Sequence, residues 1–205
     1  MYKPLKYSVK RMILIQNQYY ISGKEYLNEE KLGNIKYEYI DGQVYQVSSK
    51  RSDAHVTINL NLASLLLGQL RKKGYRVYMA DMKVQIEAIN RYFYPDILLT
   101  GDLRDKEYKY FKRYPCLIVE IISDMTEAYD RGKKFADYRR LKTLKEYVLI
   151  SQDIMSVECF RRNECGRWEL FPYTRGSKVY FASVDVCFDI ATIYEDVDLI
   201  VDSKP

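Results

Sequence analysis

The sequence contains few of the residues that build zinc sites. It has one histidine, His55, and four cysteines, Cys116, Cys159, Cys165 and Cys187. No two cysteines have the CxxC spacing, so a zinc site built from cysteine and histidine is poorly supported. Cys116 lies next to an apolar segment and Cys159 lies within another, which is typical of small reduced side chains in a core. We therefore expect a reducing, cytosolic compartment.

Long apolar runs are also missing. No segment approaches the roughly 20 apolar residues that a membrane-spanning helix needs. Near the N-terminus, basic residues are followed by the apolar run Met12–Ile15, which is too short for the hydrophobic region of a signal peptide. We expect residues 1–16 to form a basic tail, in which Met12 is a second candidate start residue. Residues 201–205 are expected to form a polar tail.

The composition is that of one globular domain. Of the 205 residues, 47% are hydrophobic and 30% are charged, and this length is enough to bury a core. Because no repeat, low-complexity tract or linker is visible, residues 17–200 are predicted to form a single domain. The net charge of +5 favours anionic partners only weakly, since many basic proteins simply carry solvated Lys and Arg. The 21 tyrosines leave two alternatives open: stacking on bases, or covering the margins of a core.

Hydrophobic spacing and turn signals predict the elements of the first half. Ser22 followed by Glu25 is typical of a helix start, and Asp41-Gly42 between alternating segments predicts a β-hairpin. The clearest helix runs from a cap at Ser52 or Asp53 to Gly74. Its apolar face is predicted to comprise Val56, Leu60, Ala63, Leu67 and Leu70. The expected elements are helices over 22–33 and 52–74 and strands over 35–40, 43–47, 76–80 and 83–88.

The second half alternates strands with one helix. The segments 96–100 and 117–122 are runs of Val, Ile and Leu, which suit strands covered on both faces. The polar segment 101–114 between them is expected to be an exposed, mobile loop. Further expected elements are a helix over 126–141, strands over 146–150, 156–162, 167–173 and 179–188, and a helical turn over 190–196. This pattern predicts an α/β domain with a mixed sheet.

Two of these strands each carry a carboxylate. Asp96 follows Pro95 at the start of one strand, and Glu120 interrupts the apolar run of the other. Mg²⁺ prefers hard oxygen ligands, commonly one or two carboxylates, and a metal that polarises the phosphate promotes phosphodiester hydrolysis. An unpaired carboxylate in an apolar strand is costly. The alternatives are a solvent-facing or Arg-paired Glu120, and an Asp96 that only begins a strand.

The helix after the Glu120 strand carries a candidate lysine. Asp130, Lys134 and Tyr138 are spaced i, i+4 and i+8, so they share one face. A lysine that faces Glu120 can orient the attacking water and stabilise negative charge. The alternative is a solvated basic helix. Six more basic residues lie close by in the sequence: Arg131, Lys133, Arg139, Arg140, Lys142 and Lys145.

Two upstream residues are further candidates. Glu38 alternates with Ile40 but neighbours two tyrosines, so the sequence leaves its direction open. His55 lies in the first turn of the long helix, where it could face a phosphate or the acidic cluster. A first-turn histidine can equally be a surface or capping residue.

Six motifs occur in an order that resembles the Uma2 family (DUF820) of restriction-endonuclease-like proteins. They are Tyr37-Glu38-Tyr39-Ile40-Asp41-Gly42, Ala54-His55, Tyr94-Pro95-Asp96-Ile97, Val119-Glu120-Ile121-Ile122-Ser123, Tyr129-Asp130-Arg131-Gly132-Lys133-Lys134-Phe135 with Tyr138, and Lys145-Glu146-Tyr147-Val148-Leu149. Each motif is weak alone, and the six in order are fairly specific. The resemblance extends from about Tyr20 to Asp196. This family is a branch of the PD-(D/E)xK nuclease superfamily.

The resemblance implies a fold and a site. The fold is restriction-endonuclease-like, with a central mixed sheet flanked by helices. Asp96 and Glu120 are implied as metal ligands, with Glu38 as a further ligand or a residue that supports them, and with His55 in the site. A (D/E)xK motif would place lysine at position 122, where this sequence has Ile122. Branches whose lysine has moved to the following helix point instead to Lys134.

Two hypotheses from different classes follow. The first is a Mg²⁺- or Mn²⁺-dependent endonuclease acting on double-stranded DNA. The second is a non-catalytic nucleic-acid-binding or regulatory module that keeps the nuclease fold. A homodimer is an additional expectation, because a duplex has two strands to cut, and the strands within 156–173 are candidates for pairing between two copies.

Overall fold

The computed structural model describes residues 13–15, 18–47 and 51–199. The strands are β1 (Ile13–Ile15), β2 (Gln18–Tyr20), β3 (Tyr37–Ile40), β4 (Gln43–Gln46), β5 (Arg76–Met79), β6 (Lys83–Ile86), β7 (Arg91–Phe93), β8 (Ile97–Thr100), β9 (Phe111–Lys112), β10 (Leu117–Ile122), β11 (Glu146–Ser151), β12 (Ser156–Arg162), β13 (Trp168–Thr174), β14 (Lys178–Phe181) and β15 (Val186–Asp189). The α-helices are α1 (Gly23–Leu32), α2 (Asp53–Leu70), α3 (Glu127–Tyr129), α4 (Phe135–Tyr138) and α5 (Ile190–Ile193). Short 3-10 helices are η1 (Arg71–Lys73), η2 (Glu87–Ile89) and η3 (Leu103–Lys106), and η4 (Asp130–Lys134) is a π-helix.

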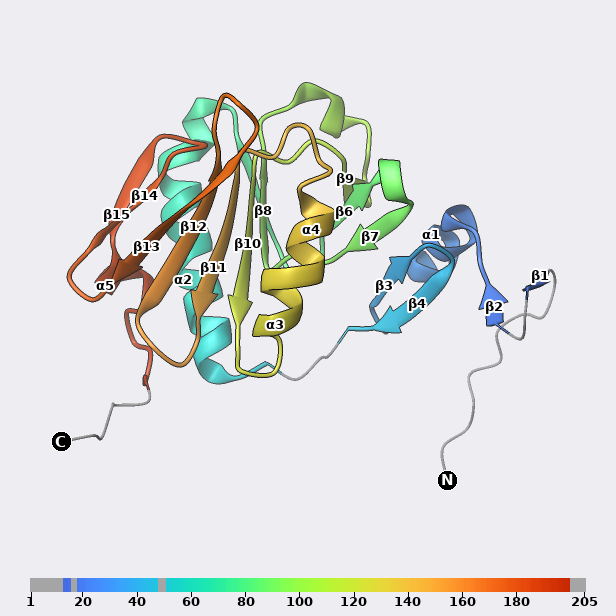
Figure 1. Cartoon of the computed structure of the whole chain (residues 1–205), viewed down its shortest axis with the longest axis horizontal. Helices are drawn as coiled ribbons and strands as arrows, with labels where there is room; N and C mark the ends of the chain where they lie inside the picture. The colour runs from blue at the N-terminus through green and yellow to red at the C-terminus, as the bar shows by residue number, and fades with distance from the viewer. Residues whose placement is uncertain (1–12, 16–17, 48–50, 200–205) are drawn as a thin grey trace.

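A six-stranded mixed sheet is the centre of the fold, as the sequence predicted. Its strand order is β13-β12-β11-β10-β8-β5. β10 and β11 are parallel and the other neighbours are antiparallel. The parallel pair is joined by a crossover that contains α3, η4 and α4, and Figure 1 shows α2 behind the sheet and α3 and α4 in front of it. Both faces of β10 are therefore covered, which explains its apolar sequence.

Helix α2 covers one face of this sheet, but with a different side from the one predicted. The fully buried residues of its contact stripe are Ile58, Leu62, Leu66 and Leu70. Of the predicted face, Ala63 and Leu70 are buried, whereas Val56, Leu60 and Leu67 are exposed. Helix α2 is apolar on more than one side, so the hydrophobic spacing in the sequence was compatible with two different buried faces. Packing against β8 and β10 selected the stripe that also carries the buried His55.

Substitutions at buried and at exposed positions of α2 should show which of its two apolar stripes packs on the sheet. We expect Leu66→Ala to lower the free energy of unfolding by about 3 kcal/mol, because a fully buried leucine leaves a cavity. Leu60→Ala removes a side chain that is 56% exposed and should change stability by less than about 0.5 kcal/mol. Urea denaturation of both variants measures the difference. Equal losses would contradict the orientation of α2.

The opposite face of the sheet packs on the crossover segment. Ile118 and Ile122 of β10 join Phe135 and Tyr138 of α4 in a second core cluster, whereas the alternate residues of β10 face α2. Glu120 lies between Ile118 and Ile122 in sequence and hence points to the same side as they do. Strand alternation thus directs the one carboxylate of β10 toward the crossover helix.

A second sheet, with strand order β4-β3-β7-β6-β9, lies beside the first (Figure 1), and α1 packs on it through Tyr26, which contacts Tyr39 of β3 and Tyr92 of β7. The hairpin β3–β4 and the capping box of Ser22 and Glu25 are confirmed. Strand β7 was not predicted, since three residues give too short a pattern. The segment 101–114, predicted as an exposed, mobile loop, is exposed over much of its length but contains η3 and β9, and its Asp105 and Lys112 are buried.

The ends of the chain differ from prediction in detail. Residues 13–15, within the predicted tail, form β1, which pairs with β2, while residues 1–12 and 201–205 lie outside the described residues. The segment 179–188 is a hairpin of β14 and β15 rather than one strand. In the described part of the chain, β13 pairs only with β12, and pairing of these strands between two copies stays a prediction. No helix within that part has the length and apolar character needed to cross a bilayer.

Candidate active site

The two predicted acids lie at two neighbouring antiparallel strands. Ile97 of β8 pairs with Val119 of β10; Asp96 directly precedes Ile97, and Glu120 directly follows Val119. Both residues are only 3% exposed. The predicted alternative of a solvent-facing Glu120 does not fit this burial, and Asp96, although it directly precedes β8, is buried as well. The structure brings these two carboxylates together inside the fold.

Asp96 is held by three donors. The backbone N–H of Ile121 donates to Oδ2 at 2.8 Å, His55 Nε2 lies 3.1 Å from Oδ1, and Arg51 Nη2 lies 3.4 Å from Oδ1. Burial alone would raise the pKa of Asp96. The hydrogen bond of His55 and the charge of Arg51 outweigh burial and hold the pKa of Asp96 below its usual value. Asp96 is therefore kept as a carboxylate.

Glu120 has a different environment. Lys134 Nζ lies 2.8 Å from Glu120 Oε1, and the Tyr138 hydroxyl donates to the same oxygen at 2.9 Å. Burial raises the pKa of Glu120 to about 8, with Lys134 opposing the shift and Asp130 and Asp96 adding to it. Burial thus disfavours the charged form of Glu120, and the ammonium group of Lys134 beside it favours that form.

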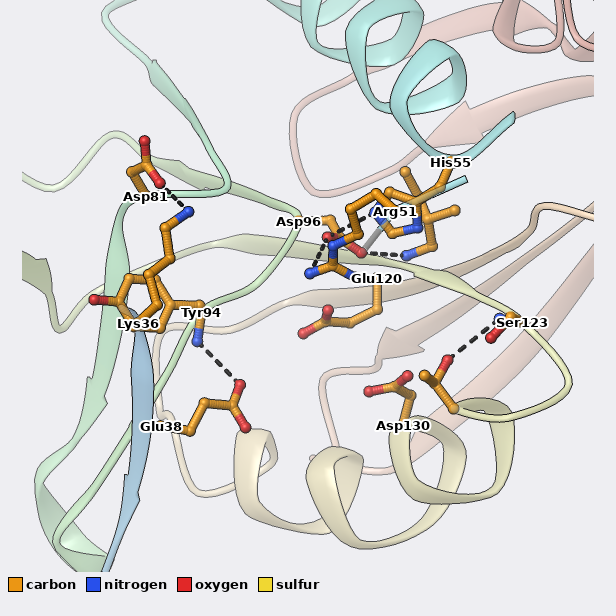
Figure 2. A network of polar contacts seen from close by, with 12 residues as sticks. Lys36, Glu38, Arg51, His55, Asp81, Tyr94, Asp96, Glu120, Ser123 and Asp130 are labelled. Carbon is orange, nitrogen blue, oxygen red and sulfur yellow. Dashed lines mark hydrogen bonds and ion pairs between the residues drawn. The ribbon is translucent and has the colours of Figure 1, made fainter. Parts of the chain in front are cut away.

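Lys134 stands among three carboxylates from three elements. Besides Glu120, its Nζ lies 3.5 Å from Asp130 Oδ1 and 3.6 Å from Glu38 Oε1. Burial would lower the pKa of Lys134, but the charges of Glu120, Glu38 and Asp130 outweigh it and raise this pKa well above its usual value. In Figure 2 the carboxylates of Glu38, Glu120 and Asp130 point toward one common space between β10 and the helical segment. Lys134 is therefore a charged ammonium and not a solvated surface lysine.

The helical segment gives this arrangement its geometry. Asp130, Lys134 and Tyr138 are all buried, so the predicted shared face is confirmed, whereas Lys133 is exposed. The turn from Asp130 to Lys134 is π-helical, a wide turn that occurs frequently at functional sites. The Tyr147 hydroxyl on β11 donates to the backbone carbonyl of Asp130 at 3.0 Å and ties this turn to the sheet.

The structure also orients the two upstream candidates. Glu38 on β3 accepts a hydrogen bond from the backbone N–H of Tyr94 at 3.2 Å (Figure 2), and its Oε1 lies 3.6 Å from Lys134 Nζ. His55 is buried against Asp96, so the surface alternative for it is wrong. Ser52, and not His55, caps α2 through its side chain. The second sheet and the N-terminus of α2 thus meet at the same cluster.

Two residues that contact the site, Arg51 and Tyr147, were not predicted. Arg51 lies one residue before the cap of α2, and its position just upstream of His55 was the one sequence feature that could have indicated a place in the site. Tyr147 could not be distinguished from the other core tyrosines by spacing. The side chain of Arg51 is 37% exposed, which leaves part of its guanidinium open to solvent while it contacts Asp96.

The raised pKa of Glu120 predicts a pH effect on stability. Its folded pKa of about 8 exceeds the usual 4.5, so between these values the folded state binds more protons than the unfolded state. The free energy of unfolding therefore falls as pH rises through this window. In Glu120→Gln we expect a smaller fall between about pH 5 and about pH 8 than in the wild type. Urea denaturation across that range measures it, with the exposed-site variant Glu107→Gln as control; equal slopes in all three proteins would contradict it.

Comparison with known proteins identifies the family. The sequence profile of Uma2, described as "Putative restriction endonuclease", matches residues 24–184. The chain belongs to the Uma2 family. The uncharacterized protein slr1290 of Synechocystis sp. is 34% identical over 174 residues, covering 85% of this chain and 91% of that protein. A second uncharacterized Synechocystis protein, sll1609, is 27% identical over 162 residues, covering 78% and 90%.

A solved structure shares the Uma2 fold. The crystal structure of a "putative nuclease belonging to DUF820" from Anabaena variabilis superposes with a TM-score of 0.67 and covers 85% of this chain and 97% of that one. At 16% identity this likeness shows the fold alone. The predicted family and the restriction-endonuclease-like α/β fold are both confirmed.

The Uma2 chain has no lysine at the (D/E)xK position, and the structure gives a physical account. Ile122 points to the same side as Glu120 but packs in the core with Phe135 and Tyr138. The ammonium group near Glu120 comes instead from the helical segment, through Lys134. The position two residues after Glu120 is therefore free to be apolar.

The residues of the site fit a hard divalent cation that keeps part of its own water. Within residues 18–47 and 51–199, no group of three or more His, Cys, Asp or Glu side chains is placed to hold a metal by itself. Asp96 and Glu120 supply two carboxylates, which matches the way Mg²⁺ is held by one or two carboxylates together with water and phosphate oxygens. None of the four cysteines belongs to the described cluster, so the cluster lacks the thiolate ligands that are typical of structural zinc sites.

Proposed function

We propose that this protein is a Mg²⁺- or Mn²⁺-dependent endonuclease that hydrolyses phosphodiester bonds in double-stranded DNA. Membership in the Uma2 family, described as "Putative restriction endonuclease", supports the reaction class. One arrangement carries the proposal: Asp96, which directly precedes β8, and Glu120, on the paired strand β10, are both buried, with Lys134 Nζ 2.8 Å from Glu120. This is a two-carboxylate-and-lysine arrangement buried at one end of the central sheet.

In this proposal Asp96 and Glu120 hold the cation. When bound, a divalent cation supplies charge that polarises the phosphate and lowers the pKa of a water molecule. Asp96 is ready for this role, because Ile121 and His55 fix its orientation and its pKa lies below the usual value. Tyr138 fixes one oxygen of Glu120 in the same way.

Two basic residues are suited to the substrate. Lys134 has three N–H donors on its ammonium group, and a donor turned away from Glu120 can hydrogen-bond the attacking water or a phosphate oxygen. Stabilisation of developing charge by such a fixed donor is a large term in catalysis. Arg51 is partly exposed beside Asp96, and a guanidinium matches two phosphate oxygens at once. The two basic side chains thus flank the acid pair from opposite sides: Lys134 comes from η4, and Arg51 comes from the segment just before α2.

Cleavage of plasmid DNA tests this function. We expect the purified protein to nick or linearise supercoiled double-stranded DNA with Mg²⁺ or Mn²⁺, and to be inactive with EDTA. Parallel reactions with single-stranded DNA and RNA establish the preferred substrate. If the wild type binds DNA in a salt-sensitive way but never cuts it under these conditions, the non-catalytic binding module is the correct function instead.

A further inference from the structure

A cavity of about 280 Å³ lies next to the candidate active site. It opens at the carboxyl-terminal ends of β10 and β11, where Ile122, Ser123 and Ser151 line it. Ile122 is two residues after Glu120 on the same face of β10, a displacement of about 7 Å along the strand. The space beyond the carboxyl ends of parallel strands is a common place for ligands in α/β folds. A molecule held at Glu120 therefore has this cavity within reach.

The walls of the cavity differ in character. Ile122, Leu149 and Ile154 give it an apolar side. The other side is polar and preorganised: Arg131 Nη1 lies 2.5 Å from Glu158 Oε2, and its Nη2 lies 2.7 Å from Glu127 Oε1. At the opening of the cavity, Ile154 is 53% exposed. The neighbouring Met125, which does not line the cavity, is 92% exposed. Apolar contact on one side and a fixed polar edge on the other suit a heterocycle with a hydrogen-bonding edge.

The charge of the cavity restricts what enters it. Four acids, Asp124, Glu127, Asp153 and Glu158, line it with the single base Arg131, an excess of three negative charges. This excess repels a phosphate. Carboxylates accept hydrogen bonds from the exocyclic amino groups of bases, as in recognition of cytosine N4 by Glu or Asp. The backbone of a nucleic acid would therefore stay near Arg51 and Lys134, while a base could turn toward the cavity.

We propose that this cavity receives one unpaired base of the nucleic acid substrate and prefers bases with an exocyclic amino group to thymine. The inference rests on the proposed nuclease function. The volume lies just below the roughly 300 to 1,000 Å³ typical of pockets for drug-sized ligands, which suits a single base. Taking a base out of the stack costs least in an unpaired or mismatched region. The cavity would thus direct the enzyme to such regions.

Binding of short single strands in EDTA tests the proposal without cleavage. We expect the wild type to bind a deoxycytidine decamer about tenfold more tightly than a thymidine decamer at the same salt concentration, which corresponds to about 1.4 kcal/mol. In Glu158→Gln this ratio should shrink to less than about threefold, since an amide both donates and accepts hydrogen bonds. Glu169→Gln makes the same charge change at an exposed position on β13 and should keep the wild-type ratio. Fluorescence anisotropy of labelled decamers measures all three proteins.

A second measurement uses only the wild type, because Glu158→Gln also loosens Arg131. A single 2-aminopurine, which carries an exocyclic amine, should raise the affinity of a thymidine decamer and change its fluorescence on binding. Equal affinity for all decamers, or an equal loss for both decamers in Glu158→Gln, would overturn the base-binding cavity. If plasmid cleavage occurs without any base preference, the cavity proposal fails and the nuclease stands. A base preference without cleavage supports the cavity and overturns the nuclease.

Discussion

Asp96→Asn and Glu120→Gln are each expected to lower the rate of DNA cleavage by about a thousandfold or more, because each removes a charge that the cation needs. A change of about 4 kcal/mol in the activation free energy gives this factor. Both variants should fold. Asn and Gln keep the shape of the side chain, and Glu120→Gln also removes a carboxylate whose pKa is raised to about 8 by burial. Initial rates on supercoiled plasmid, at saturating Mg²⁺, are the measurement.

The control for this pair is an exposed carboxylate. Glu107→Gln changes the net charge by the same amount on the exposed surface of the 101–114 segment, and it should retain wild-type cleavage. Cleavage by Asp96→Asn at more than about a tenth of the wild-type rate would remove this carboxylate from the proposed metal site.

Lys134→Met is expected to lose both activity and stability. Loss of a fixed donor to a developing charge typically reduces kcat by about a hundredfold to a thousandfold. The substitution also leaves Glu120, Asp130 and Glu38 without their shared cation, since Lys134 Nζ is 2.8 Å from the first and within 3.6 Å of the other two. Removal of one partner from a buried ion pair costs about 3 to 5 kcal/mol. Cleavage rates and urea denaturation measure the two effects.

The pH dependence of Lys134→Met distinguishes electrostatics from lost packing. Without the ammonium group, Glu120 and Asp130 take up protons more readily in the folded state, so lowering the pH relieves their repulsion. The stability deficit should therefore be smaller at about pH 5 than at about pH 8. Lys133→Met, at the exposed neighbouring position, should match the wild type in both assays. A deficit that does not change with pH would show that the loss comes from packing.

The central elements of the fold could be predicted because their signals are local. The capping box at Ser22, the hairpin turn at Asp41-Gly42 and the apolar runs of β8 and β10 are each encoded within a few neighbouring residues. The buried face of α2 could not be predicted, because this helix is apolar on two sides and only the sheet selects one. Strand β7 pairs with β3, and β9 within 101–114 pairs with β6; both partners are distant in sequence.

The same distinction applies to the candidate site. Spacing correctly put Asp130, Lys134 and Tyr138 on one face, but it gave no reason to choose Lys134 over six nearby basic residues. Only the three-dimensional approach of the helical segment to Glu120 makes that choice. Arg51 was missed because its partner, Asp96, is far along the chain and the contact needs the packing of α2 on β8. A role for these residues in catalysis stays a prediction.

The ion pair between Lys134 and Glu120 has a consequence for how the site responds to its environment. In the proposed metal site, the ammonium group of Lys134 would compete with the metal ion, since it already lies 2.8 Å from Glu120 Oε1. The metal affinity would then be weaker than the two carboxylates alone would give. A monovalent ion offers no more charge than the ammonium group already present, whereas a divalent ion does. Under this proposal the lysine would make the pair of acids selective for divalent ions, and below a threshold metal concentration Glu120 would stay paired with Lys134.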